Sequence, residues 1–166
     1  GFSGWIDPFN NIHLAYSHNG TNSYIFYRKI SYSYSNGTIS VSDEQTVESG
    51  GTSQMYPSIT ASESGIVYAA YRYYDGSSYS IKVKSYGGSS WSDSLQTATS
   101  ADSGVYPVLI NWDDRPALIY KEANAIKWNY YAGAWKADGW TNESITSEVD
   151  SDTGLEFSAI ESVDNN

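Results

Sequence analysis

The sequence of this chain shows few combinations of residues that could carry out acid–base or nucleophilic chemistry. The 166 residues contain no cysteine, so neither thiolate chemistry nor disulfides are available. His13 and His18 are isolated, and the alternation of His13 with Ile12 and Leu14 predicts a packed or solvated imidazole rather than a ligand. The sequence has no nucleophile elbow and no phosphate-binding loop. These residues favour a protein that is not an enzyme.

An acidic segment is the candidate metal site. Asp150 and Asp152 stand at alternate positions before Gly154, as ligands do in loops that bind calcium. The full loop needs a bidentate carboxylate at its twelfth position, and the match is partial. The pattern favours a solvated acidic connector, with calcium as the alternative and no other cofactor.

The glycosylation pattern Asn-x-Ser/Thr occurs at Asn19, Asn36 and Asn142. Each site falls where strands are expected to turn or to join, so an attached glycan would have room. The alternative explanation is that Asn-Gly is favourable turn chemistry in a chain rich in Ser and Thr. Covalent N-glycans would place the protein outside the cell or on its surface.

The sequence contains a repeat of about 50 residues, which determines the strands and loops on which these residues are expected to lie. Tyr56-Pro57-Ser58-Ile59 returns as Tyr106-Pro107-Val108-Leu109, and 106 − 56 = 50. Another copy opens the chain at Phe2-Ser3-Gly4-Trp5, and Phe157-Ser158-Ala159-Ile160 begins one more. Repeats of this period are typical of propellers, solenoids and arrays.

Each repeat has the pattern of four short strands separated by turns rich in Gly, Asn, Asp and Ser. The strands are expected at 2–6, 12–17, 24–33 and 39–47; at 58–61, 66–73, 80–86 and 91–98; and at 108–111, 116–121, 125–131 and a run opening at Trp135. Asn36-Gly37 predicts a tight hairpin, because both residues tolerate positive φ. The expected fold is therefore all-β, with β-propeller-type four-stranded antiparallel blades at about 2–50, 56–100 and 106–148, and one extra strand at about 155–163.

The Tyr-Pro-Ser-Ile, apolar-Ala-Tyr and Gly-Ser-Ser-Trp elements resemble blades of sialidase-like and related six-bladed β-propellers, which occur in many secreted and surface proteins. The likeness covers nearly the whole chain and implies architecture rather than activity. A sialidase-like glycoside hydrolase would need an arginine cluster, a tyrosine nucleophile and acidic partners. Arg28, Arg72 and Arg115 are expected at non-equivalent positions, and the segment 90–94 departs from that family's Ser-x-Asp-x-Gly-x-Thr-Trp box. A glycosidase fragment is therefore the less favoured alternative.

Three blades cannot close such a ring alone, so we expect assembly. Either two chains complete one ring, or a terminal strand is donated to a neighbour's incomplete blade, because an unpaired strand is a template for association. The alternatives are a fragment of a longer repeat array and a stand-alone stack. The residues expected in the assembly strands are Phe2, Trp5, Ile6, Leu155, Phe157, Ile160 and Val163.

The composition of the chain limits the classes of partner that it could bind. A net charge of −10 and a pI near 4.4 disfavour nucleic acid and anionic membrane surfaces. No apolar run reaches the length of a membrane span, and no signal peptide is evident, as expected of a processed chain.

Two classes of function remain. The first is a non-enzymatic extracellular glycoprotein that assembles with itself into a fibre, layer or ring. The second is a carbohydrate-binding module whose exposed aromatic rings stack on external glycans. Packing between blades is the simpler explanation of the aromatic residues that such a module would use, which are Tyr73, Tyr74, Tyr79 and Trp140.

Overall fold

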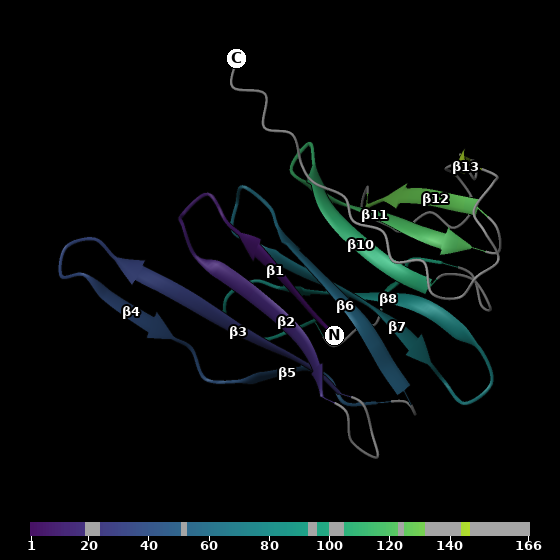
Figure 1. Ribbon diagram of the computed structural model, residues 1–166, viewed down its shortest axis with the longest axis horizontal. Helices are drawn as coiled ribbons and strands as arrows, with labels where there is room; N and C mark the ends of the chain where they lie inside the picture. The colour runs from purple at the N-terminus through teal and green to yellow at the C-terminus, as the bar shows by residue number, and fades with distance from the viewer. Residues whose placement is uncertain are drawn as a thin grey trace.

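The computed structural model describes residues 1–18, 24–50, 53–92, 96–99, 105–122, 125–131 and 144–146. Within these ranges every regular element is a β-strand, and the strands form three antiparallel sheets. The predicted all-β class is confirmed. Figure 1 shows the three sheets side by side, with the chain passing through them in order.

The first sheet contains β1 (Phe2–Ile6), β2 (Ile12–His18), β3 (Tyr24–Ser33), β4 (Thr38–Val41) and β5 (Gln45–Glu48). Both β4 and β5 pair with β3, so the single strand expected over 39–47 is divided. Ser42 causes the division, because its hydroxyl accepts from the N–H of Lys29 at 2.9 Å and takes the place of a backbone partner.

The second sheet has the order β6 (Ser53–Ala61), β7 (Val67–Tyr74), β8 (Tyr79–Tyr86) and β9 (Gln96–Thr97). Of the strand expected over 91–98, the structure describes Trp91, which makes an isolated bridge to Tyr86, and β9, which pairs regularly with β8; residues 93–95 lie outside the described residues.

The third sheet has the order β10 (Val105–Trp112), β11 (Arg115–Glu122), β12 (Ala125–Tyr130) and β13 (Ser144–Thr146). The run expected from Trp135 lies outside the described residues, and β13 occupies the fourth place in the sheet. All three sheets therefore run as antiparallel meanders.

The turns follow the chemistry of their residues, with one correction. Asn36-Gly37 does not form a two-residue hairpin: the loop covers 34–37, only Gly37 has positive φ, and its N–H donates to the carbonyl of Ser33 at 2.8 Å. Asp113 and Asp114 do form a two-residue turn, with φ of 52° and 57°, between β10 and β11.

Each sheet packs its face on the next, which gives the molecule two layers of core. Tyr27, Val47, Ile59 and Tyr71 belong to the buried cluster between the first and second sheets. Leu109 and Leu118 belong to the cluster between the second and third sheets. Burial of a large apolar side chain contributes about 1.5–3 kcal/mol to the free energy of unfolding, so these layers hold the three sheets together.

Candidate functional site

The first strand of each sheet lies against the first strand of the next, with β6 between β1 and β10 (Figure 1). A groove of about 470 Å³ runs along these three strands, and it is lined by residues 1–5, 56–59 and 106–109. The groove is therefore made from the repeated Tyr-Pro motif and from its counterpart at the start of the chain.

Tyr56 and Tyr106 stand at the same point of this repeat and share an unusual backbone. Their φ angles are 54° and 57°, and each precedes a proline within a shift of strand register. Left-handed φ at a bulky residue costs about 1–3 kcal/mol, so surrounding contacts must hold it. One such contact joins the two rings, whose centroids are 4.6 Å apart.

Among the residues that line this groove there is no Asp, Glu, His, Lys or Arg side chain. The three arginines belong to three different sheets and have separate partners. Arg28 lies 3.9 Å from Glu44, and Arg115 lies 3.5 Å from Asp113. Arg72 instead contacts tyrosines. The arrangement offers no pair of carboxylates and no arginine cluster at the groove.

Arg72 is part of a cluster of aromatic rings next to the groove. Its guanidinium lies 4.9 Å from the ring centre of Tyr56 and 4.6 Å from that of Tyr79, which is typical of cation–π contacts. Tyr79 also stacks on Tyr74 at 4.6 Å. Tyr73 lies apart, because its ring packs against the core between the first two sheets. Of the residues expected to stack on glycans, the structure brings together only Tyr74 and Tyr79, and Trp140 lies outside the described residues.

His13 belongs to a buried polar network. Its Nε2 lies 3.0 Å from the carboxylate of Asp7, and its Nδ1 lies 2.8 Å from the hydroxyl of Tyr27. Burial alone would raise the pKa of Asp7, but hydrogen bonds from Asn11 and His13 outweigh it and lower that pKa below its usual value. Burial raises the pKa of Tyr27. With His13 and Tyr27 almost fully buried, this network joins β2 to β3 and has no opening for a substrate.

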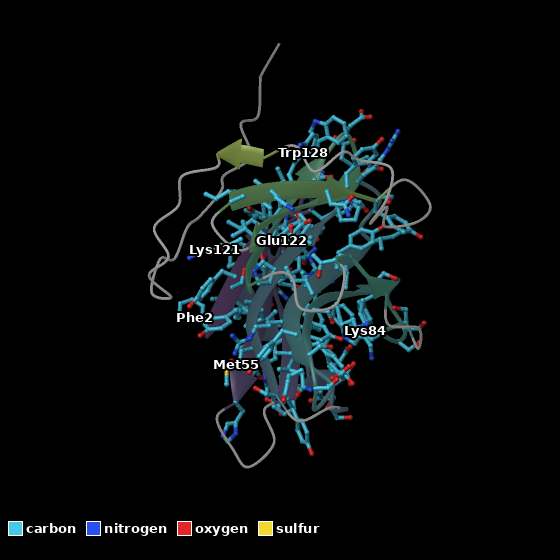
Figure 2. The ribbon with its side chains drawn as sticks, turned by 90° about the vertical axis from the view of Figure 1, so that its right-hand side faces the viewer. Phe2, Met55, Lys84, Lys121, Glu122 and Trp128 are labelled. Carbon is cyan, nitrogen blue, oxygen red and sulfur yellow. The ribbon has the colours of Figure 1, made fainter. Side chains whose placement is uncertain are left out.

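The first sheet has an apolar face that no other described sheet covers, which we call the outer face. Its two most exposed members on β1 are Phe2, at 83% exposed, and Ile6, at 64%. In the view of Figure 2, Phe2 lies at the margin of the molecule. Trp5 points the other way and packs on the core between the first two sheets. By strand register the outer face also contains Ile12, Leu14, Tyr16, Phe26, Arg28, Ile30, Tyr32, Ile39 and Val41.

Two polar contacts between neighbouring sheets repeat along the molecule. The hydroxyl of Ser3 accepts from the N–H of Ile59 at 3.3 Å, and the hydroxyl of Ser58 accepts from the N–H of Leu109 at 2.8 Å. Each serine thus ties the first strand of its own sheet to the first strand of the next.

The second contact comes from the third strand of a sheet. Lys84 Nζ donates to the carbonyl of Val47 at 2.9 Å, and Asn129 Nδ2 donates to the carbonyl of Ala98 at 3.0 Å. Val47 lies on β5 and Ala98 directly follows β9. In the register of their sheets, the segments Thr46-Val47-Glu48 and Thr97-Ala98-Thr99 occupy equivalent positions. This contact was not predicted from the sequence, although the likeness of these two tripeptides, 51 residues apart (97 − 46 = 51), was a signal for it.

Asn36 lies in the exposed loop between β3 and β4. Its amide oxygen accepts from the hydroxyl of Thr38 at 2.7 Å and from the N–H of Thr38 at 3.2 Å. The other predicted sites lie outside the described residues: the glycosylation sites Asn19 and Asn142, the acidic pair Asp150 and Asp152, and the assembly residues Leu155, Phe157, Ile160 and Val163.

No family model and no curated protein matches this chain. In the part of the chain that the structure describes, no three His, Cys, Asp or Glu residues are grouped as metal ligands would be. The same part contains no helix long and apolar enough to cross a membrane.

Proposed function

We propose that this chain is a non-enzymatic extracellular glycoprotein that assembles with itself through sheets of the propeller-blade type. The observation that carries the proposal is the outer face of the first sheet. Phe2, Ile6 and Ile39 on this face are each more than 60% exposed, and neighbouring exposed apolar side chains of this kind are typical of a protein interaction surface.

The blade arrangement is part of the proposal. Four-stranded antiparallel meanders stacked face to face, with their first strands adjacent, are what a propeller requires. The repeated serine contacts between first strands support a regular step from one sheet to the next. A ring built with this step needs more sheets than the three described here, and further copies of the chain would supply them.

The extracellular location rests on the glycosylation pattern and on the charge. Asn36 is exposed in the loop between β3 and β4, as an acceptor must be to be reached. A net charge of −10 keeps an assembly of many copies in solution. Secretion from a eukaryotic host followed by mass spectrometry tests this part: we expect the chain to carry glycan mass that Asn36→Gln reduces, and a secreted chain with no glycan mass would contradict it.

Sedimentation velocity over a wide range of protein concentration tests the assembly itself, with negative-stain images of the same samples. We expect species larger than one chain, whose fraction rises with concentration, and rings or fibres in the images. A chain that stays monomeric at all concentrations would overturn the proposal.

The second candidate is carbohydrate binding at the groove. Tyr74 and Tyr79, next to the cation of Arg72, give it specific support, since aromatic faces stack on sugar rings. Calorimetric titration with neutral and acidic oligosaccharides tests it. Binding that is lost in Tyr79→Ala, with self-association unchanged, would favour this second function.

A further inference from the structure

We propose that the outer face of the first sheet receives the third sheet of a second copy of this chain, so that copies join head to tail. This inference rests on the proposed self-assembly, and it names the partner surface. It comes from comparing equivalent positions in the three sheets, which the strand register defines.

The outer face includes positions that are buried in the other two sheets. Ile6 pairs with Ile12 in the first sheet as Ala61 pairs with Val67 in the second. Ala61 and Val67 are 2% and 1% exposed, because the first sheet covers them, whereas Ile6 and Ile12 are 64% and 37% exposed. The first sheet therefore carries an apolar surface of the same kind as one that already packs on a preceding sheet.

On the outer face, Arg28 occupies the position that makes this polar contact between sheets, but its described contacts lie within its own sheet, to Tyr16, Ser42 and Glu44. Arg28 stands opposite Leu14, as Lys84 stands opposite Ala69 and Asn129 opposite Leu118. Lys84 and Asn129 each donate to a carbonyl of the preceding sheet. Arg28 donates instead to the carbonyl of Ser42 in its own sheet, at 3.0 Å. A preceding sheet would give Arg28 the acceptor that its two counterparts have.

The third sheet offers that acceptor. Ser144 on β13 pairs with Lys127, as Thr97 on β9 pairs with Lys82 and Thr46 on β5 pairs with Phe26. The next residue, Ile145, therefore stands where Val47 and Ala98 stand. In the proposed joint, Arg28 donates to the carbonyl of Ile145 of the second copy.

The third sheet also has an apolar surface to place against the outer face. By register, Val108 and Ile119 occupy the positions of Ser58 and Ala70, which face the following sheet. Ile110, Ile126 and Trp128 lie on the same side, and all of these side chains are half-buried. Figure 2 shows Trp128 at the end of the molecule formed by the third sheet.

Head-to-tail joining fits these positions better than pairing of two outer faces. Two outer faces brought together would place two copies of Arg28 in one interface and would supply neither with a fourth-strand carbonyl. Joining of unlike surfaces repeats the contact that the chain already makes twice within itself.

The experiment uses one variant on each surface. Ile12→Asp alters the outer face, and Ile119→Asp alters the third sheet. Each alone should weaken self-association at least about tenfold, because the joint would bury an unpaired charge. Ile66→Asp is the matched control, since Ile66 has the same 37% exposure as Ile12 but lies in a turn of the second sheet.

Mixing the two variants gives the decisive result. Each keeps one intact surface, so a mixture of Ile12→Asp and Ile119→Asp should form a complex of one copy of each, seen by sedimentation, while neither associates alone. Circular dichroism checks that both are folded, and Ile6→Asp replaces Ile12→Asp if that variant is not.

The other outcomes separate this inference from the proposed function. Wild-type association that survives Ile119→Asp, or a mixture that stays monomeric, overturns the head-to-tail joint but leaves self-assembly standing. A wild-type chain that never associates overturns both, as expected if a preceding sheet of a longer chain covers the outer face.

Discussion

The two interfaces between sheets have the same register but different chemistry. Between the first and second sheets, aromatic rings pack beside a buried acid: Glu48 is 7% exposed, accepts from the hydroxyl of Tyr71 at 3.0 Å and lies 3.4 Å from Lys84. Between the second and third sheets, the buried cluster is mainly aliphatic, with Ile81 and Leu118 fully covered. Polar contacts in one interface and buried apolar area in the other thus hold neighbouring sheets in the same relative register. The two interfaces should therefore respond differently to substitution.

The largest effect is expected from Tyr27→Ala in the first interface. Tyr27 is 1% exposed, packs on Trp91 with ring centres 5.3 Å apart and holds the ring of His13. Its removal leaves a cavity and an unpaired imidazole nitrogen, so we expect a loss of about 4 kcal/mol in the free energy of unfolding. Urea denaturation measures it, and a loss below about 2 kcal/mol would show that the interface relaxes around the gap.

Leu118→Ala makes the corresponding change in the second interface. Leu118 is fully buried and has no polar group to leave unpaired. We therefore expect the cavity cost alone, about 3 kcal/mol, by the same denaturation measurement. If Leu118→Ala proves more damaging than Tyr27→Ala, the polar contacts of the first interface contribute less than we propose.

Lys84→Met isolates the buried ion pair. The substitution keeps an unbranched apolar side chain one atom shorter, and it leaves Glu48 without its cation and the carbonyl of Val47 without its donor. We expect a loss of about 2 kcal/mol in the free energy of unfolding, measured by urea denaturation. A double-mutant cycle with Glu48→Gln separates the pair from the packing, and additive losses would show that the two side chains are not coupled.

Ser58→Ala tests the contact that both interfaces share. It removes the acceptor of the N–H of Leu109, and Ser3→Ala removes that of Ile59. Each substitution should lower the free energy of unfolding by about 1 kcal/mol. The loss should be greater for Ser58→Ala, because the hydrogen bond that Ser58 accepts is shorter and buried. Equal losses would mean that water replaces both hydroxyls equally well.

The smallest effect is expected in the pH dependence. Asp7 in the first interface has a lowered pKa, and hydrogen bonds from the N–H groups of Ser78 and Ser77 lower the pKa of Asp75, in an exposed turn, to about 2. A folded-state pKa below the unfolded one gives stability above pH 4 or so that is lost as the pH falls through the folded value. Asp7→Asn should flatten the acid side of the stability profile, and the profile of Asp75→Asn provides the comparison.

Much of the strand pattern could be predicted from the sequence, because short apolar runs are bounded by strong turn residues. β1 and β3 begin and end where they were expected. Ser42 was harder to foresee, since its effect depends on a hydroxyl reaching across to the neighbouring strand. Alternation predicted that His13 faces away from Ile12 and Leu14, but not that Asp7 and Tyr27 bind it, because that contact joins a turn to two strands.

The candidate site was less predictable, for a physical reason. Arg28, Lys84 and Asn129 share one position but are three residue types, so their likeness appears only when register aligns the sheets. Glu48 resembles any surface acid in the sequence, yet Tyr71 and Lys84 bury it. Contacts between sheets are hard to predict from the sequence, because the sequence pattern mainly reflects the alternation of side chains along each strand.

The division of the last strand of the first sheet at Ser42 has a consequence for how copies can meet. A long straight rim would invite another backbone to hydrogen-bond alongside it, the route by which β-rich proteins form amyloid-like aggregates. Here the rim bends after four residues of β4 and resumes as β5, so it offers no continuous template. Uncontrolled edge-to-edge stacking is therefore discouraged, whereas the proposed joining through side-chain surfaces does not use this rim.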